Sequence, residues 1–261
     1  MDKKTISRDG TELAYARAGQ GPAVILVSGA MSTGGTMAPL AAQLADRFTV
    51  LRHDRRGRGE SGDTAPYAVE REVEDLAALV DAAGGEAALY GVSSGGALVL
   101  EAAAAGLPVR RVAVYETPYA LDEEGAQGRA EYTASLTEAL AQGRRGDAVE
   151  LFLRLTGLAE EMIRGARQSP MWAGMEAIAP TLAHDDSVMG GGLVPRERLA
   201  SITVPVLAVA GEASPPWLRE AVRAVADAVP DGTYRTLEGQ THMVDPNVLA
   251  PVLAEFFGRE G

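Results

Sequence analysis

Short apolar runs alternate along the chain with longer segments whose apolar residues recur every three or four positions. The unbroken run Pro22–Val27 is typical of a buried central strand, whereas Val69–Ala83 has the apolar spacing of a helix. Further strands are expected at Phe48–Arg52, Ala87–Tyr90, Val109–Tyr115, Val204–Ala210 and Thr233–Leu237, and further helices at Met37–Asp46, Gly96–Ala105, Pro216–Val229 and Asn247–Phe257. Strands that alternate with helices predict an α/β fold, with a mostly parallel sheet covered by helices on both faces.

Two segments depart from this alternation. Asp9-Gly10 between the short runs Thr5–Arg8 and Glu12–Arg17 predicts a β-hairpin. From about residue 122 to 198 no strand is convincing, and helices are expected at Glu131–Gln142, Asp147–Leu155 and Glu160–Ala166. We therefore expect a core of residues 1–118 and 199–261, and a helical cap of residues 119–198 over the sheet edge where such folds bind ligands.

Composition narrows the classes of function. A length of 261 residues suits one large domain with an insertion, and a net charge of -12 offers no basic surface for nucleic acid or an anionic membrane. The absence of cysteine excludes disulfides and thiolate nucleophiles, and three histidines give little basis for a metal site. The absence of cysteine fits a cytoplasmic protein, and the N-terminus has no apolar segment of the kind found in signal peptides. We expect a monomer or a homodimer.

The segment Gly91-Val92-Ser93-Ser94-Gly95 carries the most specific chemistry. A G-x-S-x-G motif can mark an ordinary loop in a chain with 30 glycines, but here it joins a predicted strand to a predicted helix. That context predicts a nucleophile elbow with Ser93 at its strained apex. Side chains at Gly91 or Gly95 would collide with the neighbouring strand and helix, and the helix N-terminus would favour a developing oxyanion.

A serine nucleophile needs a base, and His242 is the first candidate. It follows the last predicted strand, in a loop that reaches the same sheet edge as the elbow. The alternatives are His53, which adjoins the glycine-rich segment Asp54–Gly62, and His184, which we expect to face water among neighbouring aspartates.

The Asp54–Gly62 segment, the elbow and the late His242 together resemble the α/β-hydrolase superfamily over nearly the whole chain. The resemblance implies the α/β-hydrolase fold with an inserted cap, Ser93 as nucleophile and His242 as base. Many members of the superfamily carry an aspartate in a G-x-x-D arrangement after the penultimate strand, but here Ser214 stands at that place. The triad is then either incomplete or takes its acid from elsewhere.

Glu116 is the candidate acid, because it follows the strand after the elbow helix and precedes Thr117-Pro118, where exposure is less expected. The chain resembles the zearalenone-type lactone hydrolases in three features. These are the Ser93-Ser94-Gly95 elbow, a glutamate and then a proline just after the following strand, and the lack of the usual aspartate. Glu212 and Asp245 remain alternatives for the acid.

The oxyanion hole is expected from the backbone N–H of Ser94 and from that of Gly29 or Ala30, in the loop after the Pro22–Val27 strand. Met171, Trp172 and Met175 in the cap either line an apolar pocket or pack cap helices together. The candidate pocket residues are Met31, Met171, Trp172, Met175 and Met243.

These residues predict a serine hydrolase that cleaves a small apolar ester or lactone, including a macrolactone, through an acyl-enzyme on Ser93. Such a mechanism needs no metal or organic cofactor. Three alternatives remain: a thioesterase, amidase or carbon–carbon bond hydrolase, a hydrolase-fold protein that only binds a ligand, and a cofactor-free cyclase.

Overall fold

An eight-stranded sheet forms the centre of the molecule in the computed structural model, which describes residues 1–259. The strand order across the sheet is β1-β2-β4-β3-β5-β6-β7-β8. The strands are β1 (Lys3–Ile6), β2 (Glu12–Ala18), β3 (Ala23–Val27), β4 (Thr49–His53), β5 (Ala87–Val92), β6 (Val109–Tyr115), β7 (Val206–Gly211) and β8 (Gly232–Leu237).

The sheet is parallel except at one edge. The β1–β2 hairpin forms at Asp9-Gly10 as predicted, and β2 also pairs antiparallel with β4. The register sets Val27 beside Gly91 and Val92 beside Tyr115, and Tyr115 in turn beside Val209. Because parallel strands end at the same edge, the loops after β3, β5, β6 and β7 converge there.

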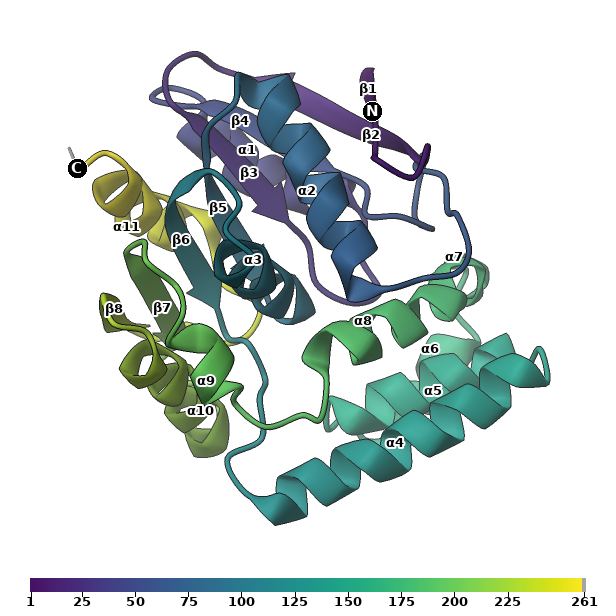
Figure 1. The fold of residues 1–261 in the computed structure, drawn as a ribbon. Helices are drawn as coiled ribbons and strands as arrows, with labels where there is room; N and C mark the ends of the chain where they lie inside the picture. The colour runs from purple at the N-terminus through teal and green to yellow at the C-terminus, as the bar shows by residue number, and fades with distance from the viewer. Residues whose placement is uncertain (260–261) are drawn as a thin grey trace.

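Helices cover both faces of this sheet (Figure 1). Helices α1 (Ala38–Leu44) and α11 (Pro246–Phe257) bury their apolar residues against one face. Helices α2 (Val69–Ala83), α3 (Ser94–Ala104) and α10 (Pro216–Ala228) pack on the other, beside the short α9 (Arg196–Leu199). A 3-10 turn at Gly34–Met37 precedes α1.

Five helices that precede α9 interrupt the alternation of strands and helices between β6 and β7. They are α4 (Glu123–Ala141), α5 (Arg145–Leu155), α6 (Glu160–Arg167), α7 (Trp172–Ile178) and α8 (Leu182–Met189). These inserted helices gather beyond the end of the sheet towards which β3 and β6 point (Figure 1). They share a separate apolar cluster that includes Tyr132, Leu136 and Leu182, so they have a small core of their own.

The predicted α/β fold, a mostly parallel sheet covered by helices on both faces, is confirmed, and the differences lie at element boundaries and in two further helices. Helix α4 begins eight residues before the expected Glu131 (131 − 123), because Asp122 accepts a hydrogen bond from the Gly125 N–H and caps it. Helices α7 and α8 were not expected. Within residues 1–259, no helix combines the length and apolarity that crossing a bilayer demands.

Candidate active site

Backbone strain marks three loops at the carboxyl edge of the sheet. In residues 1–259 three non-glycine residues have a positive φ: Met31 (54°), Ser93 (55°) and Glu116 (47°). They follow β3, β5 and β6, respectively. Such conformations cost about 1–3 kcal/mol each and persist where the surroundings enforce them, which is typical of functional sites.

Ser93 lies between β5 and α3, at the turn that the motif predicts. A Cβ at Gly91 would lie 2.2 Å from the Gly95 carbonyl oxygen, and one at Gly95 would lie 2.6 Å from the Ser28 carbonyl oxygen. Both glycines are therefore required by close backbone contacts, as predicted. The Ser93 N–H donates to the Tyr115 carbonyl at 2.9 Å, which fixes the elbow against β6.

Glu116 contacts the ring of His242. Its Oε2 lies 2.9 Å from His242 Nδ1, and its Oε1 accepts a hydrogen bond from the Gly211 N–H at 2.8 Å. The Glu116 side chain is 0% exposed, whereas that of His242 is 44% exposed. Because Nδ1 faces the carboxylate, Nε2 is the ring nitrogen that makes no contact with Glu116.

Neighbouring contacts hold the loop that carries His242. The Tyr115 hydroxyl donates to the Thr241 carbonyl at 2.6 Å, and the Ala213 N–H donates to the Gln240 carbonyl at 2.9 Å. A Cβ at Gly211 would lie 2.3 Å from the same Gln240 oxygen, so glycine allows the loop to approach β7. The histidine is therefore positioned by the ends of β6 and β7.

The alternative acids make other contacts. Glu212 is exposed and accepts a 3.3 Å hydrogen bond from the Gly239 N–H, and Asp245 caps α11 through the Asn247 N–H at 2.8 Å. Within residues 1–259 neither carboxylate hydrogen-bonds to His242. Ser214 is buried away from solvent at the place where an aspartate is common in the superfamily.

The other two histidines are buried in the frame of the molecule. Burial, reinforced by the positive charge of Arg55, lowers the pKa of His53 to about 4. The ring of His184 stacks on Tyr67 with 3.9 Å between ring centroids, and burial lowers its pKa. The expectation that His184 faces water is therefore wrong, because α8 turns this side chain towards the core.

The loop after β3 lies beside Ser93. A Cβ at Gly29 would lie 3.0 Å from Ser93 Cβ and 3.6 Å from Ser93 Oγ, so glycine keeps this space open. Ser94 is the first residue of α3, where backbone N–H groups have no acceptor within the helix. Within residues 1–259 no hydrogen bond engages the N–H of Ser94 or that of Ala30. Both donors remain available to an oxyanion.

The candidate pocket residues fall into different environments. Trp172 is 7% exposed inside the apolar cluster of the inserted helices, which favours the packing interpretation for it. Met31 and Met175 are partly buried against the same cluster. Met171 is 74% exposed and Met243, next to His242 in the chain, is 87% exposed.

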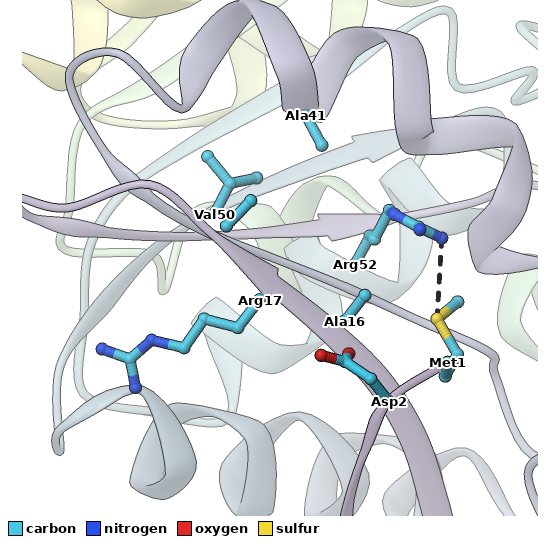
Figure 2. A pocket seen from close by; sticks show the side chains of 8 residues that line it. Met1, Asp2, Ala16, Arg17, Ala41, Val50 and Arg52 are labelled. Atoms are coloured by element: carbon cyan, nitrogen blue, oxygen red, sulfur yellow. Dashed lines mark hydrogen bonds between the residues drawn. The ribbon is translucent and has the colours of Figure 1, made fainter.

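A surface pocket elsewhere on the molecule is separate from these residues. A pocket of about 360 Å³ lies against β2, β4 and α1 (Figure 2), and its lining includes Arg17 and Arg52 but none of the candidate site residues. In the part of the chain that the structure describes, no group of three or more histidine, aspartate and glutamate side chains is arranged to hold a metal ion.

Sequence reasoning missed the buried charges behind the elbow. Arg55, Arg56 and Arg58 are each 1% exposed, and each donates to buried carboxylates. The sequence of α2 contains an indication of these buried ion pairs. Glu72 and Asp75 fall on the buried face of this helix, where apolar residues are expected.

The sequence is similar to those of known hydrolases along most of its length. The sequence profile of the alpha/beta hydrolase family matches residues 24–252. A 2-(acetamidomethylene)succinate hydrolase from Mesorhizobium japonicum is 29% identical, over 91% of this chain and 88% of that protein. A pimeloyl-[acyl-carrier protein] methyl ester esterase from Xanthomonas campestris is 31% identical, over 86% and 89%.

A solved structure extends the likeness to the whole fold. An alpha/beta hydrolase from Sphaerobacter thermophilus superposes with a TM-score of 0.90 at 52% identity, covering 98% of this chain and 100% of that one. The match spans the sheet, the elbow and the inserted helices together. The chain belongs to the alpha/beta hydrolase family.

Proposed function

We propose that the protein is a serine hydrolase of carboxylic esters, lactones included, with Ser93 as nucleophile, His242 as general base and Glu116 as the acid of the triad. The observation that carries the proposal is the 2.9 Å contact between His242 Nδ1 and the buried Glu116 carboxylate, at the sheet edge where Ser93 adopts its strained φ. A carboxylate in this position holds the imidazole in one tautomer and stabilises its protonated form.

The reaction proceeds in two halves. His242 Nε2 takes the hydroxyl proton while Ser93 Oγ attacks the carbonyl carbon, and the negative charge collects on the carbonyl oxygen between the N–H groups of Ser94 and Ala30. The ester C–O bond breaks, the leaving alcohol receives the proton from His242, and Ser93 carries the acyl group. Water then attacks the acyl-enzyme, giving its proton to His242, and the carboxylic acid departs as Ser93 regains a proton. In a lactone the alcohol stays attached to the acyl chain.

The chemical class of substrate rests on the relatives and on the residues beside the nucleophile. One relative is by its name an esterase of a methyl ester and the other a hydrolase. Met31 follows the oxyanion loop and Met243 follows His242, so both offer apolar surface to the acyl or alcohol group. We assign the inserted helices α4–α8 the role of a cap over this site.

A pH-stat assay tests the proposal. Wild type should release acid from p-nitrophenyl butyrate or from a resorcylate macrolactone, while Ser93→Ala should release none above the uncatalysed rate. Ser187→Ala is the matched control, because this exposed hydroxyl donates to the Ala183 carbonyl of its own helix and lies outside the candidate site. Acid release by Ser93→Ala at the wild-type rate would contradict the proposal, and release from only one substrate would define the preference.

A further inference from the structure

A buried carboxylate from the inserted helices reaches the residue next to the nucleophile. Asp185 lies on α8, which packs against α3, and is 5% exposed. Its Oδ1 accepts hydrogen bonds from the Ser94 hydroxyl at 2.8 Å and from Arg55 at 2.7 Å, and its Oδ2 accepts from Arg58 at 2.6 Å. We call Asp185, Arg55, Arg58 and Ser94 the Asp185 network.

The two arginines continue from Asp185 to the loop after β3. Arg58 donates to the Gly29 carbonyl at 2.7 Å, and Arg55 donates to the Ser28 carbonyl at 3.4 Å. In a trans peptide the carbonyl and the following N–H point in opposite directions. A Gly29 carbonyl held on Arg58 therefore turns the Ala30 N–H to the other side of the peptide, in the loop that adjoins Ser93.

The charge of Asp185 is needed to keep this arrangement. Within residues 1–259 Asp185 is the carboxylate partner of Arg58, whereas Arg55 also pairs with Glu72. Burial raises the pKa of Asp185, but Arg58, Arg55 and the Ser94 hydroxyl outweigh it and hold this pKa below its ordinary value. An uncharged residue at 185 would leave two buried guanidiniums with one carboxylate, and their repulsion would displace Arg58 from Gly29.

We propose that Asp185 is a positioning residue that sets both donors of the oxyanion hole, the N–H groups of Ser94 and Ala30, from inserted helix α8. The inference rests on the proposed function, and Asp185 itself does not touch the substrate. It follows that the inserted helices determine the rate of the chemical step as well as the shape of the site.

The test compares Asp185→Asn with Asp186→Asn. Asp186 lies on the same helix and pairs with Arg129 at 3.1 Å, so its variant controls for a weakened α8 without touching the network. The readouts are kcat and KM for p-nitrophenyl butyrate per folded molecule, and inhibition by a trifluoromethyl ketone, which forms a tetrahedral oxyanion with the serine. Asp185→Asn should lower kcat about 10²-fold, weaken the ketone by a similar factor and leave KM within about threefold.

A second variant covers the case in which Asp185→Asn does not fold. Arg58→Lys keeps a positive charge opposite Asp185 but lacks the fork that also reaches Gly29, so it should show the same loss in kcat and ketone affinity. Wild-type kcat and ketone affinity in a folded Asp185→Asn or Arg58→Lys would overturn the inference and leave the proposed function standing. A wild type that neither turns over ester nor binds the ketone would overturn both.

Discussion

The hydrogen bonds of Glu116 determine how its replacement by glutamine changes the tautomer of His242. The Gly211 N–H donates to Oε1 of Glu116, and the opposite oxygen faces His242 Nδ1. In Glu116→Gln the amide oxygen must keep the bond from Gly211, so the NH₂ group turns towards His242. Nδ1 must then accept, the ring proton moves to Nε2, and the base is lost to Ser93.

The expected loss is large because the wrong tautomer affects every turnover. Exchange of a triad carboxylate for its amide lowers kcat by about 10⁴-fold, which corresponds to about 5 kcal/mol of transition-state stabilisation. The free energy of unfolding should change by no more than about 1 kcal/mol, because the amide has the same shape and retains both contacts. The variant is thus expected to be folded and nearly inactive.

Steady-state hydrolysis of p-nitrophenyl butyrate measures this loss, and thermal unfolding confirms that the variant is folded. The matched control is Glu212→Gln, an exposed glutamate in the loop after β7 that should retain wild-type kcat. A Glu116→Gln enzyme with kcat within about tenfold of wild type would show that Glu116 does not orient His242. A large loss in the Glu212 variant would transfer the role to that residue.

Three further results are expected. The pKa of His53 lies near 4 in the folded protein and at 6.5 in the unfolded chain, so the free energy of unfolding decreases as the pH falls through this interval, by about 2 kcal/mol at pH 5. An NMR titration midpoint for His53 near 6.5 would contradict this. Gly29→Ala places a methyl group 3.0 Å from Ser93 Cβ and should lower kcat about tenfold while the protein stays folded, whereas unchanged kinetics would place the oxyanion hole elsewhere. Gly91→Ala forces its Cβ to 2.2 Å from the Gly95 carbonyl oxygen and should cost about 3 kcal/mol in chemical denaturation, so a wild-type midpoint would argue against the tight elbow.

Most of the fold could be predicted from the local pattern of apolar and polar residues. Uninterrupted runs such as Pro22–Val27 are buried strands because both faces of a parallel sheet are covered, and that burial requires apolar residues at successive positions. The elbow was equally predictable, because only glycine fits at positions 91 and 95. In each case the physical cause acts between residues that are close in sequence.

The buried ion pairs and the backbone conformation of the site depend on contacts between segments that are distant in sequence. Such contacts are harder to predict from the sequence. Asp185 and Arg58 are 127 positions apart, and the sequence shows only an acidic pair and a glycine-rich segment with three arginines. The positive φ of Glu116 is enforced by the Val209 carbonyl and the Gly211 N–H, both from β7. The glutamate could be chosen from its place after a buried strand, but its conformation could not.

Mass spectrometry of the protein treated with a fluorophosphonate shows whether Ser93 forms the covalent intermediate. One adduct per chain is expected, on the peptide that contains Ser93, with activity lost in proportion to labelling and no adduct in Ser93→Ala. Ester hydrolysis that persists while Ser93 is completely labelled, or an adduct confined to another residue, would show that Ser93 is not the nucleophile.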